Sequence, residues 1–337
     1  MKFRGIDTFR QPWVLGVIFF SAFCGSLLTW GLVTFMSNQS SVSFGAIRIS
    51  EASKPLIHPL LAYNTPEMQT VSPLEEALKL IVSTSIKNKQ LTTASVYYRD
   101  LNTGRWFGIN QDQKFVPASL FKVPLMIAYL KDAEKNPNLL STKVVNDLVS
   151  DENVNETIKA LQSVKQGERY TVDELLHYMI DSSDNNATVL LFKNVNQDTL
   201  KKVFSDLDIQ IPTTGINTDF ISVDNYSFLF RVLYNATYLS HEMSEKGLEM
   251  LSKIDFEDGL RTSSIPKSIT IADKFGEYYL IENGKVGEHQ LHDCGIVYHP
   301  KHPYLLCVMT KGEKIEDLEK LIQDISKMAY RYVNNMK

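Results

Sequence analysis

Two residues near the middle of the chain could act together on an acyl group. Ser119 and Lys122 are three residues apart in "PASLFKVPLMIAYL", at the start of a predicted helix, so they share one face of it. A hydroxyl becomes a useful nucleophile when a base lies within hydrogen-bond reach, and a buried lysine can lose its proton and become that base. The spacing therefore predicts nucleophilic catalysis. The alternative is a capping serine beside a lysine whose amine reaches water.

A serine and a lysine at this spacing are a weak signal alone. A second copy, Ser264-Ile-Pro-Lys267, contains a proline that disfavours a helical turn. Two further motifs strengthen the first copy. Ser183-Asp184-Asn185 lies between two predicted helices, and Lys274-Phe275-Gly276 ends a predicted strand in "SITIADKFGEYY". Taken separately, Ser183-Asp184-Asn185 is equally typical of an ordinary turn, and Lys274 of a solvated strand end.

In this order the three motifs resemble the signature of the penicillin-recognising serine hydrolases, and the chain looks most like the class A β-lactamases among them. The resemblance covers about residues 71–337, including the strand context of the third motif and the final strands and helix. It implies an α/β (α+β) fold of three layers. An antiparallel sheet is flanked by the terminal helices on one face and by an all-helical subdomain on the other.

The resemblance also implies roles for the first two motifs. Ser119 would be the acylated nucleophile and Lys122 its base. Ser183 would relay a proton to the leaving nitrogen, and Asn185 would hold Lys122 and the substrate amide.

The third motif would complete the site. Lys274 would supply positive charge toward the substrate carboxylate and Ser183. The oxyanion hole would consist of the backbone N–H groups of Ser119 and of Glu277, the residue after Gly276. Phe275 departs from the family pattern, because a threonine or serine at this position normally offers a hydroxyl to the substrate carboxylate. We therefore expect a different or more apolar substrate.

A second departure concerns hydrolysis of the acyl-enzyme. Class A enzymes use a loop glutamate to activate the deacylating water. Between Asn185 and Asp224 the chain contains no glutamate, and the loop "IPTTGINTDF" is short. Asp219 is the one loop carboxylate that could take over this task, although we favour a turn or cap role for it. We expect acylation followed by slow deacylation.

Other reactive centres are not predicted. His299 and His302 belong to a Pro-containing turn, and His292 and Asp293, as strand neighbours, point to opposite faces. No residues with metal-ligand spacing, no phosphate loop and no dinucleotide fingerprint occur, so we expect neither a metal nor a cofactor. A net charge of −4 without a basic run argues against nucleic acid. We expect a monomer that binds a small-molecule or peptide substrate.

The elements that position these residues follow from local patterns. A capping serine at Ser72 begins a helix, and Asn102-Thr-Gly104 marks a hairpin turn. Strands are predicted near both ends of the domain and helices between them, which favours one antiparallel sheet. The expected helices of the middle region include residues 187–195, 198–206 and 224–239.

The amino-terminal region has a different character. Residues 13–36 are uncharged and mostly apolar, which is long enough to span a bilayer. Basic residues precede them, so residues 1–12 are predicted to be cytoplasmic. A cleaved signal peptide is the alternative. Residues 37–70 would form an extracytoplasmic linker, and residues 71–337 the hydrolase domain.

Two of the three cysteines lie symmetrically about the turn in "GIVYHPKHPYLL". Cys294 and Cys307 would face each other across two strands, and an extracytoplasmic location would permit a disulfide. We favour two buried free thiols, because the geometry of a disulfide is demanding.

The sequence thus predicts a membrane-anchored, extracytoplasmic serine hydrolase that acts through an acyl-Ser119 intermediate on a β-lactam or a peptidoglycan-like amide. One alternative is a penicillin-binding D,D-peptidase or a hydrolase of another amide or ester. An alternative of another class is a non-catalytic binding or scaffold domain. Retention of all five motif residues argues against it, because a scaffold has no physical need for them.

Overall fold

The structure is a computed structural model, and the chain divides after residue 44. The predicted membrane segment lies outside the described residues. No helix among the described residues is both long and apolar enough to cross a membrane. The described residues are 46–48, 53–63, 72–154, 156–213, 215, 217–282 and 285–336.

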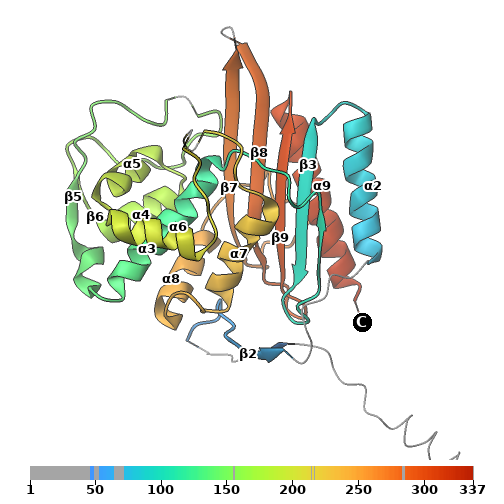
Figure 1. Ribbon diagram of the computed structural model, residues 1–337, viewed down its shortest axis with the longest axis horizontal. Coiled ribbons are helices and arrows are strands. Elements are labelled where there is room, and N and C mark those ends of the chain that lie inside the picture. Colours follow the sequence, from blue (N-terminus) through green and yellow to red (C-terminus); the bar gives the residue numbers. More distant parts are fainter. Residues whose placement is uncertain are drawn as a thin grey trace, which may run out of the picture. The chain divides into compact units, whose positions relative to one another are not determined.

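A five-stranded antiparallel sheet forms the centre of the domain (Figure 1). Its strand order, β4-β3-β9-β8-β7, brings strands from both ends of the domain side by side, as predicted. β7 is the edge strand that lies beside the helical subdomain, and β4 is the opposite edge (Figure 1). The strands are β3 (Thr93–Asp100), β4 (Trp106–Ile109), β7 (Ile271–Glu282), β8 (Lys285–Val297) and β9 (Tyr304–Gly312).

The first and last helices of the domain, α2 (Pro73–Lys87) and α9 (Ile315–Asn334), pack against each other, and α9 also packs on β8 and β9. The predicted start of α2 is confirmed, because Ser72 Oγ accepts a hydrogen bond from Glu75 N at 3.1 Å. A long apolar stripe along α9 explains its position, since its buried residues recur at helical spacing.

The middle of the chain is mostly helical and forms a subdomain on the β7 side of the sheet (Figure 1). The predicted helices 187–195 and 198–206 correspond to α5 and α6, whereas the predicted helix 224–239 is too long. α7 ends at Tyr234, because Ala236 adopts a φ of +48°, and the unpredicted α8 then begins. These helices are α3 (Lys122–Ala133), α4 (Val172–Asp181), α5 (Asn185–Asn194), α6 (Gln197–Asp206), α7 (Val223–Tyr234) and α8 (His241–Ser252).

Short elements complete the fold. Part of the predicted linker packs on the domain, because Glu245 of α8 accepts hydrogen bonds from the backbone N–H groups of Leu56 and Ile57. The Ile57 side chain is fully buried. The remaining elements are β1 (Ala46–Arg48) paired with β2 (Leu60–Tyr63), β5 (Lys143–Val145) paired with β6 (Arg169–Thr171), and the 3₁₀ turns η1 (Ala118–Phe121) and η2 (Pro137–Ser141).

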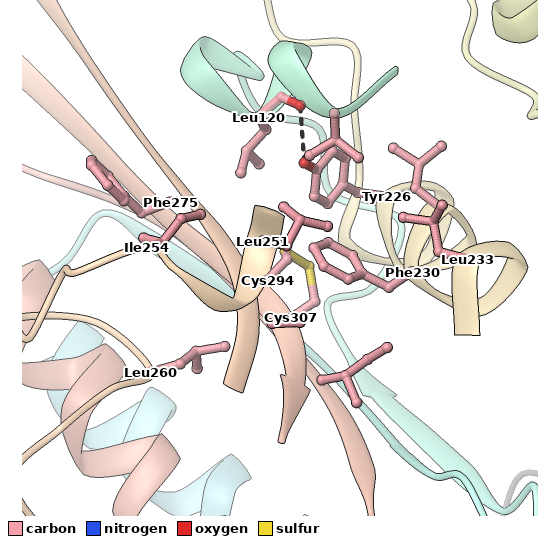
Figure 2. Packing of buried hydrophobic residues seen from close by; sticks show 14 of the residues in the cluster. Leu120, Tyr226, Phe230, Leu233, Leu251, Ile254, Leu260, Phe275, Cys294 and Cys307 are labelled. Atoms are coloured by element: carbon pink, nitrogen blue, oxygen red, sulfur yellow. Dashed lines mark hydrogen bonds between the residues drawn. A yellow bond between two sulfur atoms is a disulfide. The ribbon is translucent and has the colours of Figure 1, made fainter. Parts of the chain in front are cut away.

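Cys294 and Cys307 face each other on β8 and β9 and are joined by a disulfide, with their Cα atoms 3.9 Å apart. The preference for free thiols is therefore wrong, although the predicted pairing of the two strands is confirmed. Figure 2 shows the disulfide in the apolar core beside Phe230 of α7 and Leu251 of α8. The bond fixes β8 against β9 under the helices that support the site.

Candidate active site

The turn that carries Ser119 is held by three neighbouring elements. Ser119 lies in η1, directly after Ala118, whose φ of +50° is a strained backbone conformation for a non-glycine residue. Tyr226 of α7 donates a hydrogen bond from its hydroxyl to Leu120 O at 2.9 Å (Figure 2). This buried bond ties the turn to α7.

The edge strand β7 approaches the same turn closely. A Cβ atom on Gly276 would lie 3.0 Å from Pro117 O and 3.1 Å from Leu120 N. Any larger residue would therefore separate β7 from the turn. This close approach explains the glycine of the third motif.

Strand β8 holds the residue that precedes the turn. Val116 N donates to Gln290 Oε1 at 3.0 Å, and His292 Nε2 lies 3.0 Å from Val116 O. Burial lowers the pKa of His292 to about 4, so the ring is neutral at pH 7 and Nε2–H donates to the carbonyl. His292 thus supports the backbone and takes no proton near neutral pH.

Ser183 of the second motif is hydrogen-bonded to both lysines. Lys122 Nζ lies 3.0 Å from Ser183 Oγ and 2.8 Å from Asn185 Oδ1, and it also donates to Ser183 O at 2.6 Å. Lys274 Nζ reaches the same Ser183 Oγ at 3.0 Å. Four of the predicted polar side chains thus form one hydrogen-bonded cluster, those of Lys122, Ser183, Asn185 and Lys274. Lys122 N donates to Ser119 O within the turn. Among the described residues, no hydrogen bond joins the side chains of Ser119 and Lys122.

Burial perturbs both lysines of this cluster. The loss of solvation lowers the pKa of Lys122 well below its usual value of 10.5, and the charge of Lys274 lowers it further. Burial also lowers the pKa of Lys274, to about 8, while Asp273 and Asp293 oppose that change. The pair can therefore hold one neutral and one protonated amine near neutral pH.

Asp184 organises the loop that leads to the second motif. Its carboxylate is fully buried, caps α5, and accepts hydrogen bonds from Asn153 Nδ2 at 2.7 Å and Val164 N at 3.0 Å. Asn153 and Val164 belong to the segment between β5 and β6, residues 146–168, which we call the crossing loop; Asn155 is its one residue outside the described set. The neighbouring Ser183 adopts a φ of +55°. The buried contacts hold this strained residue in place.

Phe275 does not replace the missing hydroxyl with another polar group. Its ring stacks on Phe256 at 4.2 Å between centroids, and Lys274 Nζ lies 4.2 Å from the centre of the ring. A cation over an aromatic face is attracted by the ring electrons. Phe275 thus positions Lys274 and packs into the core near Ile254 (Figure 2).

Two contacts of the site were not predicted from the sequence. Glu156 of the crossing loop accepts a hydrogen bond from Asn185 Nδ2 at 2.5 Å. The side chain of Glu277, expected to contribute only its backbone N–H, accepts a hydrogen bond from Ile158 N at 2.9 Å. The loop has no periodicity that would place Glu156, and the one available signal is the polar run "SDENVNE".

Asp219 lies apart from this cluster. Its carboxylate forms an ion pair with Lys311 and accepts a hydrogen bond from Gln290 Nε2 at 3.2 Å. In the described part of the chain, no hydrogen bond links Asp219 to Ser119 or Lys122. No group of three or more His, Cys, Asp or Glu side chains in that part is arranged to hold a metal ion.

This fold and this cluster define a class of serine hydrolase, and sequence comparison identifies the family. A model of the Beta-lactamase enzyme family matches residues 73–333, so the chain belongs to that family. It is 23% identical to Beta-lactamase VEB-1 of Pseudomonas aeruginosa over 246 residues, which are 67% of this chain and 81% of the relative. Family membership indicates a serine hydrolase.

Solved structures share the fold at low sequence identity. A variant of PBP-A, solved as an acyl-enzyme complex with penicillin-G, is 22% identical, with a TM-score of 0.65 over 81% of this chain and 100% of that chain. A β-lactamase from Sphaerobacter thermophilus is 20% identical, with a TM-score of 0.63 over 78% of this chain and 98% of that chain. The expected class of fold is therefore confirmed.

Proposed function

We propose that the chain is an acylating serine hydrolase in which Ser119 attacks a strained or activated amide. The observation that carries the proposal is the meeting of Lys122 and Lys274 on Ser183 Oγ, each at 3.0 Å. This cluster combines an amine of lowered pKa with a hydroxyl that can pass a proton onward. Such an arrangement has no evident structural purpose, because burying two amines together is unfavourable.

Acylation begins with proton transfer. Lys122, as a neutral amine, turns from Ser183 toward Ser119 and takes the hydroxyl proton while Ser119 Oγ bonds to the carbonyl carbon. The backbone N–H groups of Ser119 and Glu277 stabilise the resulting oxyanion. Ser183 gives its proton to the leaving nitrogen and regains one from Lys122. The C–N bond then breaks and leaves an ester on Ser119.

Deacylation is the slower half of the reaction. Water must add to the ester carbonyl and lose a proton to a base, but Asp219, the predicted loop carboxylate, is paired with Lys311. Its contacts are with Lys311 and Gln290, and no hydrogen bond among the described residues links it to Ser119 or Lys122. We therefore propose that the acyl-enzyme persists.

The substrate class we propose is a β-lactam or a peptidoglycan-like amide. PBP-A, which shares the fold, forms an acyl-enzyme with penicillin-G. A D,D-peptidase that traps β-lactams fits the same chemistry. The absence of a hydroxyl at Phe275 favours a second candidate, the hydrolysis of another amide or ester.

We also propose an extracytoplasmic site of action, with residues 13–36 as the membrane anchor. The apolar length of this segment and the basic residues before it support that arrangement. The Cys294–Cys307 disulfide is in keeping with an oxidising compartment. A cell-wall substrate would be found there.

The proposal is tested by incubating the full-length chain, in mild detergent, with benzylpenicillin and following its intact mass. We expect a covalent adduct that persists for hours and is absent in Ser119→Ala. Rapid turnover without a lasting adduct would instead indicate a β-lactamase, and Asp219→Asn would then be the first variant to assay. A binding or scaffold domain would give neither an adduct nor turnover.

A further inference from the structure

The carboxylate of Glu156 occupies a position in the site that the three motifs do not provide. It accepts the 2.5 Å hydrogen bond from Asn185 Nδ2, and Asn185 Oδ1 accepts one from Lys122 at 2.8 Å. The amide of Asn185 therefore connects the lysine to a carboxylate. The negative charge of Glu156 also acts to raise the pKa of both Lys122 and Lys274, against the larger effect of burial.

The crossing loop holds Glu156 from both sides. On one side, Asn153 is bonded to the buried carboxylate of Asp184 at 2.7 Å. On the other side, Ile158 N donates to Glu277 Oε2 on β7 at 2.9 Å. The loop thus runs from the second motif to the edge strand, and Glu156 lies between these two attachments. Such a double attachment fixes the carboxylate in place.

Glu277 adds a second acidic group at the β7 attachment. Its side chain is only 8% exposed, and its Oε1 atom is buried without a hydrogen-bond partner. A buried carboxylate oxygen without a partner is costly unless a ligand or water satisfies it. The loop that carries Glu156 is therefore attached at each end to a buried acidic side chain, Asp184 or Glu277.

These contacts change the group that the site offers to a substrate from a hydrogen-bond donor to a hydrogen-bond acceptor. In the proposed mechanism, Asn185 Nδ2 would donate to the carbonyl oxygen of the substrate amide. Here Asn185 Nδ2 donates to Glu152 O at 3.3 Å and to Glu156 Oε1, so both of its N–H groups are used. The carboxylate of Glu156 is the group that remains for the substrate to contact. A carboxylate is matched by an N–H donor, and most strongly by an ammonium group. A second negative charge there would be repelled.

We propose that Glu156 is a specificity-determining residue that selects substrates with an ammonium group next to the acyl-side amide. The inference rests on the proposed acylation of Ser119 and names the substrate class of that same site. Glu277 is a positioning residue, because it holds the loop that carries Glu156. If Glu156 were a structural latch alone, removing its charge would affect differently charged substrates equally.

Benzylpenicillin and ampicillin form a matched pair of probes, because they differ by one amino group on the acyl side chain. The rate constant for acylation is measured for each by intact mass, using the full-length chain. We expect ampicillin to react about ten- to a hundredfold faster, the range for one charge-assisted hydrogen bond. In Glu156→Gln the ratio of the two rate constants should fall to near one, through loss of the ampicillin reaction.

Glu168→Gln serves as the matched control, since Glu168 ends the same loop, is exposed, and bonds to Tyr170. It should keep the wild-type ratio. A second measurement needs no variant: the ratio in the wild-type chain should fall toward one above about pH 8, where an α-amino group loses its charge. A change in the protonation of Lys274 affects the rate constants of both probes alike, so it cancels in their ratio.

The outcomes separate this inference from the function on which it rests. Adducts on Ser119 with equal rate constants, unchanged in Glu156→Gln, would overturn the selectivity and leave the acylating function intact. The absence of both an adduct and turnover with either penicillin would overturn the proposed function and the inference with it.

Discussion

Lys274 Nζ and Ser183 Oγ lie 3.0 Å apart, at the oxygen that Lys122 Nζ also approaches at 3.0 Å. Two protonated amines on one buried hydroxyl would repel each other strongly. One of the two must therefore give up its proton more readily. Lys122 is the better candidate, because burial and the charge of Lys274 lower its pKa by more than the charges of Glu156 and Asp184 raise it. Burial also lowers the pKa of Lys274, but three carboxylates oppose that change.

The acylation rate should therefore depend on pH with two limbs. It rises with pH as Lys122 loses its proton, and it falls above about pH 8 as Lys274 loses its own. In Lys274→Arg we expect an acylation rate about tenfold lower, because a guanidinium fits the site less well. The fall in rate at alkaline pH should disappear, because an arginine stays protonated there. Acylation rates from pH 5 to pH 10 test this. An alkaline limb that stays at the same pH in the arginine variant would assign it to another group.

Gly276→Ala should impair acylation more than it impairs folding. The new Cβ would meet Pro117 O and Leu120 N at 3.0 and 3.1 Å and push the Ser119 turn away from β7. We expect acylation to fall at least tenfold, with a loss of about 1–3 kcal/mol in the free energy of unfolding.

Gly312→Ala is the control for that substitution. Its Cβ would meet Gln90 O and Leu318 Cδ2, both at 3.0 Å, in a similarly crowded place on β9. We expect a comparable loss of stability with acylation preserved within about twofold. Equal losses of acylation in the two variants would contradict a specific role for Gly276 at the turn.

The motif residues could be predicted because each depends on local spacing. One helical turn relates Ser119 to Lys122, and strand alternation places Lys274 and Gly276 on one side of β7. The hairpin between β8 and β9 was predicted for the same reason. Glu156 could not be predicted, because the loop that carries it is held by hydrogen bonds to Asp184 and Glu277. These two residues are 28 and 121 positions away from Glu156 along the chain. α8 was missed because its apolar residues are few and a glycine interrupts them.

A buried pair of acids behind the site should make stability depend on pH. Burial raises the pKa of Asp293 well above 3.8, and the charge of Asp273 raises it further. A raised pKa in the folded state means that stability falls as the pH rises from about 4 through the folded value. Asp293→Asn removes this loss and keeps an acceptor for Leu260 N. We expect its melting temperature to exceed that of the wild type by about 2–4 °C at pH 8 and by much less at pH 4.

Asp273→Asn should have the opposite effect at pH 8. Burial raises the pKa of Asp273 as well, but its ion pair with Arg261 at 2.7 Å acts against that change. Loss of Asp273 therefore leaves a partly buried guanidinium without its carboxylate. Both expectations are tested by measuring the thermal unfolding of the two variants at pH 4 and pH 8. A lower melting temperature for Asp293→Asn at pH 8 would show that Asp293 is charged and stabilising there.

The disulfide should contribute to stability mainly by restricting the unfolded chain. Cys294 and Cys307 are 13 residues apart, and a loop of about this length is worth about 3 kcal/mol in the chain-entropy description. Replacing both by alanine should lower the free energy of urea unfolding by that amount, and the wild type should approach the variant when dithiothreitol is added. Thiol titration of the unfolded, unreduced chain should find Cys24 alone, and three thiols after reduction. Three reactive thiols before reduction would contradict the disulfide. If the double alanine variant keeps its acylation rate, the role of the disulfide is confined to stability.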